Sequence, residues 1–134
     1  MQIHLKIVGS LLIIVALLHF SFPKKFNWKH ELDSLSIINR QMMYVHTFFI
    51  ALIVFLIGLL CLTSSGELVG TVLGKRICLC LGIFWIVRLW VQFFGYSSKI
   101  WKGKSFETIV HVLFSVFWTY VSSIFVLSSL HLNL

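Results

Sequence analysis

Charged side chains are scarce in this sequence. Asp, Glu, Lys and Arg make up 11% of its 134 residues, and only 4 of these side chains are acidic, whereas a soluble domain carries about 25% charge. A chain with so few charges cannot coat a globular surface. One proline and eight glycines exclude collagen-like and linker-like sequence, and the 59% of apolar residues excludes disorder. The composition therefore indicates an integral membrane protein.

The motifs of common hydrolases and nucleotide-binding proteins are also missing. The sequence contains no G-x-S-x-G, no H-E-x-x-H and no Walker sequence, and no carboxylate lies inside an apolar stretch. Hydrolysis by a paired acid and base is therefore disfavoured, and whether the chain is an enzyme stays open. Nucleic-acid binding is a poor interpretation of the net charge of +7, because no basic patch has a folded platform behind it.

Four continuously apolar stretches are each long enough to cross the hydrocarbon core as a helix, which takes about 20 residues. They are residues 3–22, 42–63, 77–96 and 109–130. The first lacks an A-x-A cleavage site, so we interpret it as a span and not as a signal peptide. The loops are too short for a soluble domain. We therefore expect one all-α integral membrane domain over residues 1–134, with four transmembrane helices in an up-and-down bundle.

The loop before the second span has a helical pattern of its own. Pro23 ends the first helical region, and Asn27 is placed to cap a new helix. Apolar residues then recur at helical spacing: Trp28, Leu32, Leu35 and Ile38. This pattern predicts a short amphipathic helix in the membrane interface between spans one and two. Four aromatic residues are expected to anchor the same interface: Trp28, Tyr44, Tyr96 and Trp101.

Positive charge is distributed unevenly between the two faces of this arrangement. The loops after the first and third spans hold seven cations: Lys24, Lys25, Lys29, Arg40, Lys99, Lys102 and Lys104. The opposite face holds three: Lys6, Lys75 and Arg76. The positive-inside rule then places these two loops in the cytoplasm and both termini outside it. The same cations are expected to attract anionic lipid headgroups of the bilayer.

The second loop and the cysteines beside it give weaker signals. Residues 64–70 start with polar residues and predict a turn. Cys61, Cys78 and Cys80 flank this turn. A disulfide from Cys61 to either of the others is compatible with an oxidising face, and thiols that serve as apolar filler are the favoured interpretation.

Five polar side chains lie inside the spans, where such groups are costly and point to a functional site. They are His19, His46, Arg88, Gln92 and His111. Counted from the cytoplasmic helix ends at about 1.5 Å per residue, the depths of the three histidines and Gln92 agree to within about one helical turn, and Arg88 lies one turn deeper than Gln92. Each span thus contributes a polar group to one layer near the cytoplasmic face.

Helical periodicity brings these groups toward one another. Arg88 and Gln92 are four residues apart and share a helix face. The first span carries a stripe suited to close helix approach: Gly9, Ala16 and His19. In an up-and-down bundle, diagonal spans would place His46 opposite His111, and His19 opposite Arg88 and Gln92.

This layer predicts a binding site whose ligand stays open. His46 and His111 could hold the iron of haem b from two helices. His19, His46 and His111 could instead hold a divalent metal with one open position. In a third version, Arg88 and Gln92 donate to a quinone or lipid headgroup and the histidines carry protons. A structural role, in which each histidine satisfies a neighbouring carbonyl, is the alternative for every one of them.

The architecture resembles that of small four-span haem b proteins, which also place histidines on facing helices. The resemblance rests on the number of spans and on His46 and His111, and it implies a haem b cofactor. Two other functions fit the same sequence. The chain could be a non-catalytic subunit of a larger membrane complex, or a small lipid-binding or transport unit. A transport path would need a homo-oligomer, because four helices leave a narrow bundle.

Overall fold

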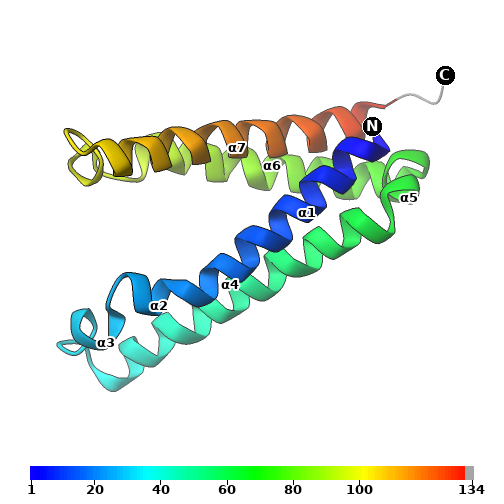
Figure 1. The fold of residues 1–134 in the computed structure, drawn as a ribbon. Helices are drawn as coiled ribbons and strands as arrows, with labels where there is room; N and C mark the ends of the chain where they lie inside the picture. The colour runs from blue at the N-terminus through cyan, green and yellow to red at the C-terminus, as the bar shows by residue number, and fades with distance from the viewer. Residues whose placement is uncertain (132–134) are drawn as a thin grey trace. The chain divides into compact units, whose positions relative to one another are not determined.

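The computed structural model describes residues 1–131, and these residues form helices with no strand among them (Figure 1). Four helical segments are long and apolar enough to cross a membrane. The first runs over Gln2–Lys25 and consists of α1 (Gln2–Leu18), the 3-10 turn η1 (His19–Ser21) and α2 (Phe22–Lys25). The others are α4 (Ile37–Thr63), α6 (Val72–Phe94) and α7 (Ser105–Leu130). The all-helical class and four candidate spans are thus as predicted, and residues 132–134 of the predicted domain lie outside the described residues.

Three of the spans begin earlier than their hydropathy suggests, because polar residues form their first turns. α4 begins at Ile37, α6 at Val72 and α7 at Ser105, where the sequence predicted residues 42, 77 and 109. Side-chain caps fix two of these starts. The Ser36 hydroxyl accepts from the backbone N–H of Asn39 at 3.4 Å, and the Thr71 hydroxyl accepts from that of Gly74 at 2.9 Å.

The helix predicted in the first loop is shorter than expected. α3 covers Trp28–Glu31, a single turn, and the next helix starts only at Ile37. Asn27 does not cap α3 with its side chain. Its backbone is left-handed at φ 51°, and its carbonyl accepts from the N–H of Glu31 at 2.9 Å. This turn directs Trp28 inward, where only 7% of it is exposed and its ring meets Tyr44 edge-on at 5.4 Å.

The described residues fall into two compact units whose relative positions are not determined, and each unit is therefore described by itself. One unit is Lys6–Ser64, and the other joins Met1–Leu5 to the residues from Ser65 onward. The up-and-down bundle of all four spans stays a prediction, as does the single domain.

In the Lys6–Ser64 unit, α1 and α4 approach each other through two glycines. A Cβ atom built on Gly9 would lie 2.6 Å from the carbonyl oxygen of Gly58. A Cβ atom on Gly58 would lie 2.7 Å from that of Gly9. Buried residues of α4 continue this face at helical spacing: Ala51, Val54 and Cys61. The small-residue stripe of the first span thus includes a contact that no larger side chain could make.

In the other unit, α6 and α7 pack side by side as a helical hairpin (Figure 1). Trp85 of α6 stacks on Trp118 of α7, with ring centroids 4.7 Å apart and planes 12° apart. Residues 64–70 are not a plain turn, because Ser65–Gly70 form the short helix α5. Gly74 lets α5 pack closely, since a Cβ atom there would collide with the carbonyl of Glu67.

None of the three cysteines, all within the described residues, forms a disulfide. The Cys78 thiol donates to the carbonyl of Leu68 in α5 at 3.8 Å, and Cys80 is exposed. Cys61 and Cys78 are buried, which supports the interpretation of these two thiols as apolar filler.

Replacement of Gly58 by alanine is expected to destabilise the protein by about 1–3 kcal/mol, because the new methyl group forces α1 and α4 apart. The midpoint of thermal unfolding in detergent should fall by several degrees. Gly70→Ala is the matched control, because no atom lies within 4 Å of the position that its Cβ would occupy. An unchanged midpoint in Gly58→Ala, or an equal loss in both variants, would contradict this contact.

Candidate functional site

Three of the five predicted site residues meet in the α6–α7 hairpin. Arg88 Nη1 donates to Gln92 Oε1 at 3.2 Å, and Gln92 Nε2 lies 3.1 Å from His111 Nδ1. Gln92 is buried, with 7% of its surface exposed. Arg88 lies six residues before the end of α6 and His111 six residues after the start of α7. Both are therefore about 9 Å in from the loop end of the hairpin.

Arg88, Gln92 and His111 form a chain of hydrogen bonds. The direction of these bonds determines the tautomer of His111. A guanidinium group can only donate, so the oxygen of the Gln92 amide must face Arg88. The NH₂ group of the same amide then faces His111 and donates to its Nδ1. In the neutral imidazole, the proton consequently lies on Nε2. Arg88 thus sets the tautomer of a histidine on the neighbouring helix through one buried amide.

Aromatic rings contact Arg88 and His111, the two ends of this hydrogen-bond chain. The guanidinium carbon of Arg88 lies 5.0 Å from the ring centroid of Trp118 and 5.8 Å from that of Tyr96, within the range of cation–π attraction. The His111 ring stacks on Trp101, with centroids 4.7 Å apart and planes 14° apart. The Thr108 hydroxyl donates to the Trp101 carbonyl at 2.7 Å and so holds the loop against the helix.

Trp101 and Trp118 were not predicted to lie beside Arg88 and His111. Trp118 follows His111 by seven residues, so a shared helix face was the available signal. Trp101 was expected only as an interface anchor. It reaches His111 from the loop between the helices, where helical periodicity gives no information.

The cluster of Arg88, Gln92, His111, Trp101 and Trp118 has many donors and few acceptors. Within residues 1–131, the ion pair found is Arg40 with Asp33, so no carboxylate neutralises Arg88. The indole N–H groups of Trp85 and Trp118 are buried and have no hydrogen-bond partner in the described chain. We call the five residues Arg88, Gln92, His111, Trp101 and Trp118 the donor cluster. A guanidinium group has five N–H donors, and Gln92 accepts from one of its nitrogens.

His19 lies in the other unit, beside a half-open cavity of about 190 Å³. Its Nδ1 lies 2.8 Å from the carbonyl oxygen of Val15, and its ring meets Phe22 at 4.7 Å. Seven further residues line the cavity: Phe20, Pro23, Trp28, Tyr44, Thr47, Phe48 and Ala51. His19 therefore has a structural hydrogen bond and also borders a space that a small molecule can enter.

His46 is exposed on α4, away from the buried residues Ala51, Val54 and Gly58 that face α1. His46 and His111 belong to different units, so their facing stays a prediction, and so does a metal site of His19, His46 and His111. Among residues 1–131, no three His, Cys, Asp or Glu side chains gather in a way that could hold a metal ion.

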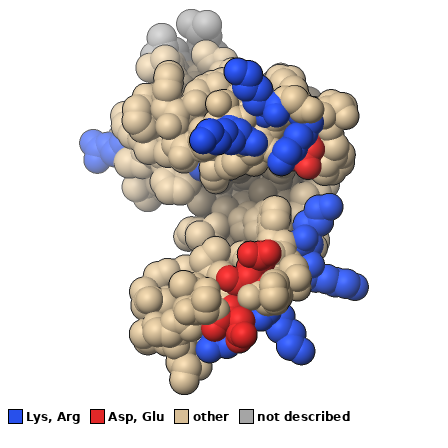
Figure 2. Space-filling view, turned by 90° about the vertical axis from the view of Figure 1, so that its left-hand side faces the viewer, with Lys and Arg blue, Asp and Glu red and all other residues tan. Residues whose placement is uncertain are grey.

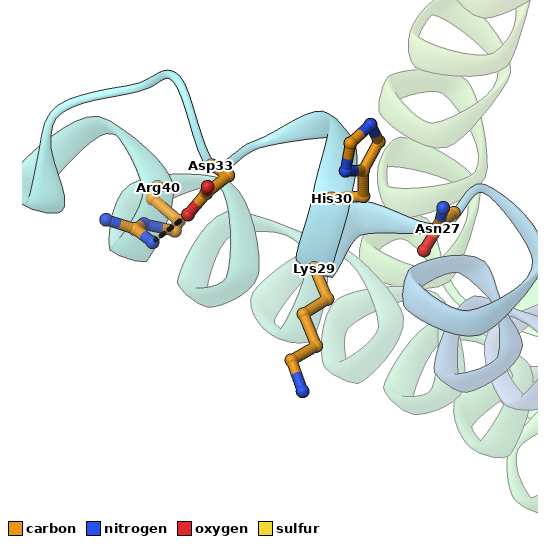
Figure 3. A pocket seen from close by; sticks show the side chains of 5 residues that line it. All are labelled: Asn27, Lys29, His30, Asp33 and Arg40. Carbon is orange, nitrogen blue, oxygen red and sulfur yellow. Dashed lines mark hydrogen bonds and ion pairs between the residues drawn. The ribbon is translucent and has the colours of Figure 1, made fainter.

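Exposed charges gather on the face of the protein that Figure 2 shows. Lys99, Lys102 and Lys104 are exposed between α6 and α7. In the other unit, an open hollow of about 440 Å³ is lined by Asn27, Lys29, His30, Asp33 and Arg40. Figure 3 shows that Lys29 and His30 point in different directions, while Arg40 reaches Asp33 at 3.4 Å. Asp33 is 76% exposed, and such a surface pair contributes about 0–1 kcal/mol to stability. This hollow therefore lacks the buried, fixed polar groups of a binding site.

The tautomer of His111 is directly measurable. In protein labelled with ¹⁵N-histidine, we expect the ring that is lost in His111→Ala to have an unprotonated Nδ1 and a proton on Nε2. Gln92→Leu should shift the Nδ1 signal of this ring, because the donor to Nδ1 is gone, while His19 should keep its own signals. A His111 ring that is protonated on Nδ1 in the unmodified protein would contradict the direction of the Arg88–Gln92–His111 chain.

Comparison with known protein families, curated proteins and solved structures gives no match for this chain. A function for the donor cluster is therefore argued from its own contacts and chemistry.

Proposed function

We propose that this chain is a small multi-pass membrane protein that binds a membrane ligand through acceptor oxygens at Arg88, Gln92 and His111. A quinone carbonyl and an anionic lipid headgroup share this chemistry. The observation that carries the proposal is the direction of the hydrogen-bond chain, which leaves the other N–H groups of Arg88 and the Nε2–H of His111 without an acceptor among the described residues. Acceptor oxygens on a ligand would satisfy donors that the described protein leaves open.

The charge of Arg88 supports the same kind of ligand. An arginine at the centre of a membrane helix costs at least about 2.5–3.5 kcal/mol, and less near the interface. Cation–π contacts with Trp118 and Tyr96 offset part of this cost. Gln92 accepts a hydrogen bond but adds no negative charge. An anionic or strongly polarised oxygen is the group that would complete the site.

The haem b and divalent-metal versions receive less support. Iron and zinc bind an unprotonated imidazole nitrogen. In His111, Nδ1 already accepts from Gln92 and Nε2 carries the proton. A metal at Nδ1 would displace the Gln92 amide, and a metal at Nε2 would require the proton to move to Nδ1 and the amide to turn its oxygen away from Arg88. Haem held by His46 and His111 remains the competing hypothesis, and the experiment below separates the two.

Orientation in the bilayer is also part of the proposal. We place the predicted loops of residues 23–41 and 97–108 in the cytoplasm and both termini outside, with the four spans in an up-and-down bundle. The excess of cations in these two loops supports the assignment. The donor cluster would then lie near the cytoplasmic face, where anionic headgroups are most abundant.

Arg88→Leu should weaken binding of the ligand by about 10- to 100-fold, because a charge-assisted hydrogen bond contributes about 1.5–3 kcal/mol. Arg88→Lys should retain part of the affinity. The measurement uses the full chain in nanodiscs: a short-chain quinone is titrated by quenching of tryptophan fluorescence, and retained anionic lipid is counted by native mass spectrometry.

Arg76→Leu is the matched control, because Arg76 is an exposed arginine in the first turns of the same helix. Equal binding by Arg88→Leu and the unmodified protein would overturn the proposal. A purified protein with a haem absorption band that disappears in both His46→Ala and His111→Ala would establish the competing hypothesis instead.

Reporter fusions test the orientation. A fusion at the carboxyl end should report a non-cytoplasmic position, and a fusion inserted between Lys99 and Lys104 should report the cytoplasm. The physical reason is the retention of positively charged loops on the cytoplasmic side during insertion. A cytoplasmic carboxyl end would reverse the assignment and place the donor cluster near the opposite face.

A further inference from the structure

We propose a second ligand site, independent of the donor cluster, in the cavity beside His19. Its occupant is the hydroxyl-bearing ring at the polar end of a membrane lipid, the chemistry that a sterol and a quinol share. The cavity lies wholly within the Lys6–Ser64 unit.

The hydrogen bond of His19 determines what the cavity can recognise. A backbone carbonyl can only accept, so Nδ1 of His19 must donate to Val15. In the neutral ring, Nε2 is then the unprotonated nitrogen and an acceptor. His19 therefore offers a ligand the opposite of what His111 offers. A group that carries an O–H bond can donate to it, whereas a ketone or an ether cannot.

Thr47 supplies a second polar group to the same cavity. Most hydroxyls elsewhere in the long helices donate to a carbonyl one turn earlier, as Thr63 does to Leu59 at 2.9 Å and Thr119 to Ser115 at 2.7 Å, and the buried Ser128 is an exception. Thr47 forms no hydrogen bond within the described chain although it lines the cavity. Its hydroxyl is thus available to donate to the oxygen of the alcohol whose proton His19 accepts.

The walls and size of the cavity select a ring. Phe20, Trp28 and Phe48 provide aromatic surfaces, and Pro23 and Ala51 complete an apolar lining. Trp28 is fixed there by the single turn of α3 and by its edge contact with Tyr44. A closed cavity of about 150 Å³ holds one benzene molecule, so about 190 Å³ accommodates one substituted ring. The apolar remainder of the lipid would extend through the open side.

The test compares alcohols with their ethers on the full chain in phosphatidylcholine nanodiscs. The probes are cholesterol and its methyl ether, and a short-chain quinol and its dimethyl ether under anaerobic conditions. A ligand that binds the folded state raises the midpoint of thermal unfolding. We expect one of the alcohols to raise the midpoint and its ether to have no effect. The alcohol that responds identifies the source of the ring.

Variants test whether the rise in the unfolding midpoint comes from binding in this cavity. His19→Phe should weaken the apparent affinity at least tenfold, and Ala51→Leu should abolish the response by filling the space. Thr47→Val removes a hydroxyl with little change of shape, and it should cause a smaller loss. His131→Phe and Arg76→Leu should respond like the unmodified protein, because both residues are exposed and neither lines the cavity or belongs to the donor cluster. Equal shifts with alcohol and ether, no shift with either alcohol, or a full response in His19→Phe would each overturn the proposal.

Discussion

Hydrocarbon provides no hydrogen bonds, so each polar group inside a membrane helix must find its partners within the protein or in a ligand. This constraint organises the polar residues of the structure. Most hydroxyls of α7 meet it locally by donating to the preceding turn, as Ser115 does to His111 and Ser122 to Trp118. Arg88 cannot meet it locally, because it has more donors than its own helix can satisfy. The chain from Arg88 through Gln92 to His111 is the partial solution.

The choice of an amide at position 92 has a consequence for charge. A carboxylate there would accept from Arg88 equally well and would neutralise it. An amide accepts on one side and donates on the other, so it passes on the direction of the hydrogen bond without cancelling the positive charge. The hairpin therefore retains an electrostatic attraction for an anionic or polarised oxygen. A buried amide bonded at both ends also resists rotation, which keeps Arg88 and His111 in fixed orientations.

Hydropathy was enough to predict the four long helices, because about 20 consecutive apolar residues have few other uses. It could not predict where helices begin, since Ser36 and Thr71 cap first turns that contain polar residues. Periodicity along α6 correctly paired Arg88 with Gln92. It failed in the first loop, where the left-handed residue Asn27 and the single turn of α3 interrupt the helical pattern. It also could not place Trp101 on His111, because that contact depends on how a loop folds back.

His111 and His19 illustrate how the neighbours of a histidine, and not the residue type, decide its hydrogen-bond chemistry. His111 receives a proton donor from Gln92 and is left with a donor, while His19 gives its proton to Val15 and is left with an acceptor. The same side chain would thus favour a carbonyl or phosphate oxygen in one unit and an alcohol in the other. A quinone and its reduced quinol differ in this property, since reduction adds a proton that can be donated while the hydroxyl oxygen still accepts. The acceptor at His19 would therefore select the reduced form of such a ligand, whereas the donor cluster would bind oxygens of either form, without any redox centre of the protein's own.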